Sequence, residues 1–250
     1  MPIASNFTSV FSKEWEIDFT QCTPNGYLKY TDLCNILQLT AGDHAAMGGI
    51  SFTEMQQFNQ AWVLSRMRVE INELPQWRDI VTVKTWIVSL ENSRSVRALE
   101  MYIGNKKIIG CETFWAVFNT KTRRPEALAL PYDHFELYPE NHPTLQRVKR
   151  IAFSGESTSV KQRAVLLSDL DIVNHVNNVK YLEWCLDLIA PELVLSGKLR
   201  GFDMNFMREL ALADDVSIVN NALVFSIVKE DIACFALQLD WESAHWKFIV

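Results

Sequence analysis

The feature that most constrains the fold is an order of segments that occurs twice along the 250-residue chain. In the first half, a short strand at 15–19 precedes a helix that Thr31 is predicted to cap and Gly48-Gly49 to end. Segments with β-type patterning follow this helix, at 61–71, 79–87, 93–103 and 107–119. A single helix against a curved antiparallel sheet is an α+β arrangement of layers.

The second half repeats this order after a proline-rich stretch, 122–146, that has little periodicity. A strand-like segment leads into a polar window and then a helix that runs to about Ile189, where Pro191 stops it. Strand patterns follow at 201–209, 214–229 and 232–241. We therefore expect a duplicated α+β domain, divided into 1–130, a linker at 131–158, and 159–250.

Composition narrows the function by exclusion. The net charge of −6 argues against a general nucleic-acid role, and no apolar run is long enough to span a bilayer. Residues 1–10 lack the pattern of a signal peptide, so a cytoplasmic protein without a membrane partner is expected. The cysteines lie apart without a CxxC pair and predict reduced, mostly packed thiols: Cys22, Cys34, Cys111, Cys185 and Cys234.

The polar window, 167–178, is the candidate reactive part of the chain. Asp171 and His175 fall close to the start of the second helix, where backbone N–H groups lack internal partners and can polarise a carbonyl oxygen. Taken alone, Asp171 and the asparagines of this window are more often helix and turn caps, and a lone histidine is more often structural.

A resemblance to a known family favours the functional interpretation of Asp171 and His175 over the structural one. Residues Asp169 to Tyr181, read as DLDIVNHVNNVKY, resemble the motif D-L-D-x-N-x-H-V-N-N-x-K-Y of the acyl-acyl carrier protein (acyl-ACP) thioesterase family of plants and bacteria. Further segments resemble the family in the same order, including WVLSRM at 62–67, TRRP at 122–125 and FMRE at 206–209. The resemblance implies a tandem, or double, hotdog fold, in which each half packs a long helix on a curved antiparallel sheet.

The resemblance also implies site residues. The family's catalytic carboxylate, histidine and strand glutamate map onto Asp171, His175 and Glu209. The family's asparagine falls on Val173, so we expect its neighbour Asn174, or a backbone N–H, to take its part. Leu210 stands where the family carries a cysteine, which excludes a thiol nucleophile there.

Substrate-binding residues are expected in both halves. Backbone N–H groups at the start of the helix that begins near Asn177 would hold a thioester oxygen. By resemblance the acyl chain lies in the first domain, where Trp62, Met67 and Trp86 are expected to line its pocket, while the second domain is catalytic.

The implied activity is hydrolysis of fatty acyl-ACP to free fatty acid, which ends chain elongation in fatty acid biosynthesis, without a metal or an organic cofactor. Either Asp171 or Glu209 can be the general base, and the sequence also allows Asp171 to attack the thioester directly. The expected partner is acyl carrier protein, and the paired halves would form a pseudo-dimer within a monomer or homodimer. Alternatives are an acyl-CoA thioesterase of the same fold, a non-catalytic acyl-binding module and, less favoured, a hotdog dehydratase.

Basic residues form small clusters despite the acidic total. A solvated loop is the ordinary interpretation of each cluster, and a docking patch for an acidic carrier protein is the functional one. The clusters are Lys106-Lys107, Lys121 with Arg123-Arg124, and Arg147 with Lys149 and Arg150.

Overall fold

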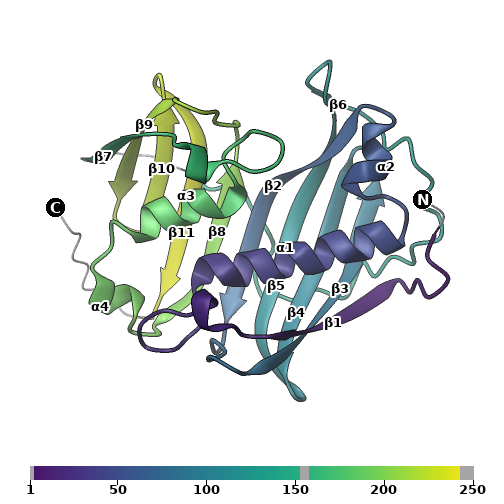
Figure 1. The fold of residues 1–250 in the computed structure, drawn as a ribbon, viewed down its shortest axis with the longest axis horizontal. Helices are drawn as coiled ribbons and strands as arrows, with labels where there is room; N and C mark the ends of the chain where they lie inside the picture. The colour runs from purple at the N-terminus through teal and green to yellow at the C-terminus, as the bar shows by residue number, and fades with distance from the viewer. Residues whose placement is uncertain (1–2, 153–157, 243–250) are drawn as a thin grey trace. The chain divides into compact units, whose positions relative to one another are not determined.

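The computed structural model describes residues 3–152 and 158–242. Its contacts divide the chain into an N-terminal unit, Met1–Lys29 with Leu33–Val148, and a C-terminal unit, Lys149–Val250 with Tyr30–Asp32. Figure 1 shows in each unit a helix against an antiparallel sheet, the arrangement that the repeated order of segments predicts.

In the N-terminal unit, α1 lies across one face of a sheet whose strands are ordered β1-β3-β4-β5-β2 (Figure 1). Leu33, Ile36 and Leu37 of α1 are fully or almost fully buried, as their helical spacing predicts. The elements in chain order are β1 (Val10–Glu16), the 3-10 helix η1 (Phe19–Gln21), α1 (Tyr30–Met47), α2 (Phe52–Gln56), β2 (Gln60–Ile71), β3 (Ile80–Glu91), β4 (Arg94–Ile103), β5 (Lys106–Asn119) and β6 (Arg124–Pro125).

Two details of this unit differ from the sequence prediction. The helix begins at Tyr30 and its N-cap is Lys29, so Thr31 is inside the first turn and does not cap it. The first strand ends at Glu16, before much of the expected 15–19 segment. The end of α1 at Gly48 is confirmed.

The stretch after β6 packs onto the N-terminal unit as far as Val148. The carboxylate of Glu70 accepts hydrogen bonds from the backbone N–H groups of Leu145 and Gln146, at 2.8 and 3.0 Å. Glu112, which is 1% exposed, accepts one from Val148 N–H at 2.9 Å. Two carboxylates, one from β2 and one from β5, thus fix the backbone of a segment that has no regular secondary structure.

In the C-terminal unit, the sheet is ordered β8-β11-β10-β9-β7. Its helix, α3, has 9 residues against 18 in α1, so the expected packing of a helix on an antiparallel sheet is confirmed with a shorter helix in the second half. The elements are β7 (Thr158–Ala164), the 3-10 helix η2 (Leu167–Asp169), α3 (Asn178–Leu186), α4 (Pro191–Val194), β8 (Leu199–Phe206), β9 (Asp215–Asn221), β10 (Val224–Lys229) and β11 (Ile232–Trp241).

Two strand predictions in this unit need correction. The segment 214–229 is two strands, β9 and β10, joined by a tight turn in which Ala222 adopts a φ of 50°. The segment 201–209 is a strand only to Phe206, so Glu209 lies in the loop beyond it.

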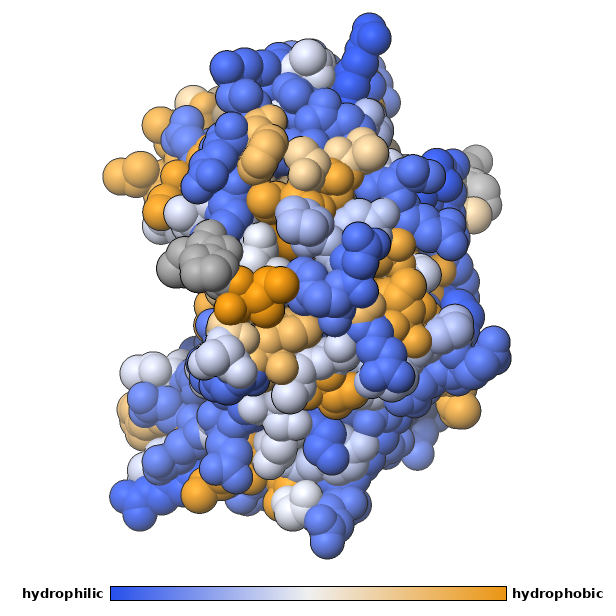
Figure 2. Space-filling view, turned by 90° about the vertical axis from the view of Figure 1, so that its right-hand side faces the viewer, coloured by the Kyte–Doolittle hydropathy of each residue, from blue (hydrophilic) through white to orange (hydrophobic). Residues whose placement is uncertain are grey.

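One face of the molecule, shown in Figure 2, carries hydrophobic residues in separate patches with hydrophilic residues between them. Apolar residues scattered in this way are ordinary on a protein surface. Among the residues that the structure describes, no helix is both long and apolar enough to cross a bilayer. Four of the five cysteines are buried and Cys22 is partly buried, and all five are free thiols.

Candidate functional site

A closed loop between η2 and α3 carries four of the eight predicted site residues, Asp171, Asn174, His175 and Asn177. Asp171 N–H donates to the carbonyl of His175 at 2.9 Å, and Asn174 N–H donates to the carbonyl of Asp171 at 3.0 Å. Asn174 sits in the left-handed region with a φ of 64°. Because asparagine and glycine adopt this conformation at low cost, the turn accounts for a residue of this type at position 174.

The side chain of Asp171 shapes the same loop. Its Oδ1 accepts hydrogen bonds from the backbone N–H groups of Val173 and His175, at 3.0 and 3.3 Å. This is the turn-capping geometry typical of aspartate. Asp171 therefore caps the turn, in addition to any role in the chemistry.

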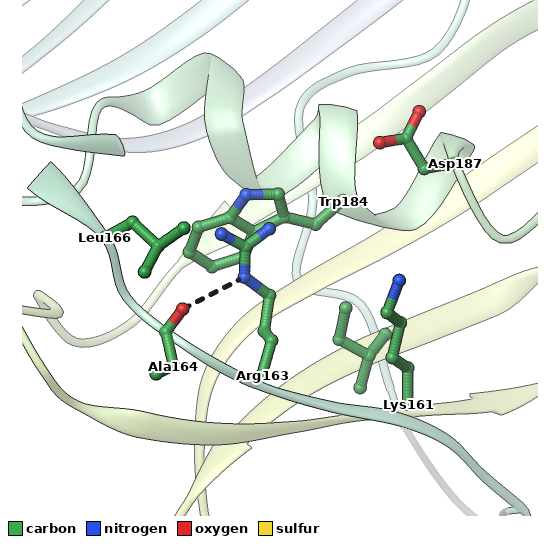
Figure 3. Close-up of a pocket in the computed structure, with 7 residues that line it drawn as sticks. Lys161, Arg163, Ala164, Leu166, Trp184 and Asp187 are labelled. Carbon is green, nitrogen blue, oxygen red and sulfur yellow. Dashed lines mark hydrogen bonds between the residues drawn. The ribbon is translucent and has the colours of Figure 1, made fainter. Parts of the chain in front are cut away.

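A buried acid supports the loop from behind. Asp169, 4% exposed, accepts hydrogen bonds from Leu166 N–H at 2.8 Å and from Arg163 Nη2 at 2.7 Å. Its backbone carbonyl accepts the N–H of Asn177 at 2.9 Å. The guanidinium of Arg163 also lies over the Trp184 ring (Figure 3), 3.9 Å from the ring centre. The sequence pattern did not predict the ion pair between Arg163 and Asp169, because Arg163 lies outside the polar window, in β7.

The start of α3 is capped by Asn177. Its Oδ1 accepts the N–H of Val179 at 3.2 Å, and its carbonyl accepts the N–H of Lys180 at 2.9 Å. Two of the first amides of the helix therefore already have partners within the chain, which limits what they offer to a substrate oxygen.

His175 and Glu209 come together although they lie on different elements. Their Nε2 and Oε2 atoms are 3.5 Å apart, and their side chains are 33% and 34% exposed. The residues that follow them are joined by a hydrogen bond, from Val176 N–H to the carbonyl of Leu210 at 2.9 Å. The result is an imidazole beside a carboxylate that solvent can reach, an arrangement suited to proton transfer.

The residues predicted to line an acyl pocket lie in the N-terminal unit. Trp62 packs against the cluster of Ile50, Met55 and Ile87, and its Nε1 donates to the Ile50 carbonyl at 3.0 Å. Trp86 belongs to a different cluster, with Val88 and Ala98. Met67 is fully buried. The structure thus places Trp62 and Trp86 in separate hydrophobic clusters, and their lining of one pocket stays a prediction.

A pocket of about 330 Å³ lies in the C-terminal unit (Figure 3). None of the predicted site residues lines it. Its lining consists of Lys161, Arg163, Ala164, Leu166, Trp184, Asp187 and Ile218. Within the described parts of the chain, no three His, Cys, Asp or Glu side chains are grouped as metal ligands would be.

Taken together, the two units define a tandem hotdog protein with an acid–imidazole pair in its second half. Family models agree with this architecture. The model of the acyl-ACP thioesterase N-terminal domain matches residues 8–133, and that of the acyl-ACP thioesterase C-terminal domain matches residues 154–244. The chain belongs to the acyl-ACP thioesterase family, which confirms the resemblance drawn from the motifs.

Curated relatives and solved structures agree with this family assignment. The palmitoyl-acyl carrier protein thioesterase of Cuphea hookeriana is 31% identical over 192 residues, covering 70% of this chain and 46% of the relative. The oleoyl-acyl carrier protein thioesterase of Coriandrum sativum is 27% identical over 223 residues, covering 80% and 58%. The chain thus spans about half the length of the curated relatives that it matches.

Two solved structures share the fold. An acyl-ACP thioesterase from Bacteroides thetaiotaomicron superposes with a TM-score of 0.86 at 24% identity, covering 94% of this chain and 98% of that one. A 12:0-ACP thioesterase from Umbellularia californica gives 0.76 at 19% identity, covering 96% and 98%.

Proposed function

We propose that this protein hydrolyses the thioester of fatty acyl-ACP and releases a free fatty acid. The observation that carries the proposal is the contact of 3.5 Å between His175 Nε2 and Glu209 Oε2. It joins two residues that the family motif names, and it does so in a chain that belongs to the family. In this proposal the N-terminal unit holds the acyl chain and the C-terminal unit carries out the chemistry.

The division of labour follows from the contacts of each carboxylate. Asp171 uses Oδ1 to hold the loop, so it acts as a positioning residue for His175. Glu209 lies against the imidazole and is reached by solvent, so it is the better placed general base. Glu209 takes a proton from water as the water oxygen attacks the thioester carbonyl. The tetrahedral intermediate then expels the sulfur, which receives that proton through the Glu209–His175 pair.

The oxyanion of the intermediate needs hydrogen-bond donors. Asn174 is exposed at the tip of the loop, next to His175, and its side-chain amide is the candidate donor. It would replace the asparagine that the family has at the position of Val173. Asn177 contributes less directly, because its side chain caps α3.

An acyl carrier protein is the proposed partner, and Arg147, Lys149 and Arg150 are its proposed docking residues. All three are exposed, and they neighbour the backbone N–H groups of Gln146 and Val148, which Glu70 and Glu112 hold. Positive charge on a fixed backbone suits an acidic partner. A cytoplasmic location also stays a prediction.

A panel of acyl thioesters tests the proposal. Matched acyl-ACP and acyl-CoA substrates of several chain lengths are incubated with the protein, and the released fatty acid is measured by mass spectrometry. Faster hydrolysis of acyl-ACP supports the proposal, and faster hydrolysis of acyl-CoA supports the alternative substrate. Tight binding of acyl-ACP without release of fatty acid would show an acyl-binding module instead.

A further inference from the structure

The pocket of the C-terminal unit is lined by hydrogen-bond donors that have no acceptor. Lys161 and Arg163 point from β7 toward α3, which supplies Trp184 to the lining (Figure 3). The Nε1 of Trp184 is buried and finds no hydrogen-bond partner among the described residues. Within the same parts of the chain, the Nζ of Lys161 and the Nη1 of Arg163 also lack an acceptor. Because polar groups of this kind are normally paired, the pocket suits a ligand that brings acceptor atoms.

The rest of the lining indicates the chemical class of that ligand. Ala164, Leu166 and Ile218 are apolar, and the cavity measures about 330 Å³. Asp187 is the one acid among the lining residues, against two cations. A carboxylate accepts charge-assisted hydrogen bonds from lysine and arginine, and a hydrocarbon chain gains free energy from contact with apolar side chains. A carboxylate on a hydrocarbon chain therefore matches both parts of the lining.

Arg163 connects this pocket to the loop of the site residues. Its Nη2 donates to Asp169 Oδ2 at 2.7 Å, and Asp169 is only 4% exposed. The carbonyl of Asp169 closes the base of the loop by accepting the N–H of Asn177 at 2.9 Å. Further along the loop, Asp171 N–H donates to the carbonyl of His175, also at 2.9 Å. A carboxylate that binds Arg163 from the pocket competes with Asp169 for the guanidinium, and so leaves a buried acid at the base of this loop less well compensated.

We propose that this pocket binds an amphipathic carboxylate, the class to which a free fatty acid belongs, and that its occupant slows hydrolysis through Arg163. The carboxylate accepts hydrogen bonds from Lys161 Nζ and Arg163 Nη1, and the hydrocarbon chain lies against Leu166 and Ile218. The slowing rests on the proposed hydrolase function, of which a fatty acid is the product. Binding at a second site that loosens the loop of His175 lowers kcat without displacing the substrate.

Calorimetric titration with octanoate tests the binding and needs no turnover. The control ligand is 1-octanol, which has the same hydrocarbon chain without the charge and should bind more weakly. Lys161→Met should weaken octanoate binding about fivefold, because it removes a charged donor. Asp187→Asn should instead tighten it about twofold, because it removes a like charge from the lining. The matched control is Lys198→Met, since Lys198 is an exposed lysine of the same unit that does not line the pocket, and it should change nothing.

Inhibition of acyl-ACP hydrolysis by octanoate tests the effect on the reactive site. Octanoate should lower kcat of the wild type with KM little changed. Lys161→Met should keep the uninhibited kcat and need about fivefold more octanoate for the same inhibition. Ala164→Phe, which fills the pocket from an exposed position, should abolish the inhibition.

Octanoate binding that is absent, or that Lys161→Met and Asp187→Asn leave unchanged, would overturn the proposed binding site. Purely competitive inhibition would overturn its effect through Arg163. Absence of thioester hydrolysis by the wild type would instead refute the proposed function, and the titration would still decide whether the pocket binds a carboxylate.

Discussion

The N–H of Val176 donates to the carbonyl of Leu210 at 2.9 Å, and this bond aligns the loop before α3 with the loop after β8. The residue before each partner is a site residue, His175 in one case and Glu209 in the other. Their side chains therefore meet because two irregular segments are joined through the backbone, and the site depends on that alignment as much as on its own side chains.

The first prediction separates the structural role of Asp171 as a turn cap from its role in catalysis. Asp171→Asn keeps an oxygen for the N–H groups of Val173 and His175, so the free energy of unfolding should change by less than about 0.5 kcal/mol. Asp171→Ala removes both acceptors and should lower it by about 1 kcal/mol. Urea unfolding measures both. Equal stability of the two variants would contradict the capping geometry, and kcat should fall further in Asp171→Ala.

The second prediction concerns the left-handed turn at Asn174. Asn174→Gly keeps the φ of 64° at no steric cost but deletes the side-chain amide, so the fold should persist while kcat falls about 100-fold. Asn174→Ala deletes the same amide and should also lose about 1 kcal/mol of stability from backbone strain. Full activity in Asn174→Gly would place the oxyanion donor elsewhere.

The third prediction concerns docking. Reversal of charge at Arg147, Lys149 and Arg150 together should lower kcat/KM on acyl-ACP about tenfold at low salt, because electrostatic attraction steers encounter. Hydrolysis of acyl-CoA should not change. The control reverses Lys121, Arg123 and Arg124 in the same way. Equal effects of the two triple variants, or none, would count against the proposed docking residues.

The fourth prediction concerns pH and His44, which is fully buried in the N-terminal unit. Burial first, and then the nearby charge of Arg97, lower its pKa from 6.5 to about 3. The ring is therefore neutral. Its Nδ1 accepts from Arg97 Nη1 at 2.8 Å, and its Nε2 lies 3.0 Å from the Thr8 carbonyl, to which it donates.

Because the folded-state pKa is depressed, the unfolded chain binds a proton first as pH falls. His44 thus contributes stability that is present above pH 6.5 and lost between pH 6.5 and 3. The free energy of unfolding should be about 2 kcal/mol lower at pH 5 than at pH 7 from this residue alone. His44→Gln should remove that part of the slope, and an unchanged slope would contradict the buried neutral state.

Much of this site could be predicted from sequence, because the motif residues are close along the chain. Asp171, His175 and Asn177 fall within one loop and one cap, and local turn chemistry determines their geometry. Glu209 was found by resemblance alone, since nothing local shows that a residue beyond the end of β8 faces a histidine.

Other features depended on contacts between distant segments. The ion pair of Arg163 with Asp169 supports the loop, yet nothing in the sequence indicates that these two residues pair. The turn between β9 and β10 contains Ala222 at positive φ, and an alanine does not predict a turn of this kind. Glu70 and Glu112 hold the segment after β6 by accepting hydrogen bonds from its backbone N–H groups, so periodicity could not reveal that packing.

The most direct measurement is the kcat of Glu209→Gln on acyl-ACP, compared with Glu183→Gln. Glu183 lies on α3, is 40% exposed and pairs with Lys180 at 2.9 Å, so losing its charge should change kcat by less than about twofold. If Glu209 is the base beside His175, its variant should fold normally and lose at least about 100-fold in kcat. A folded Glu209→Gln protein that hydrolyses acyl-ACP at the wild-type rate would contradict the central claim.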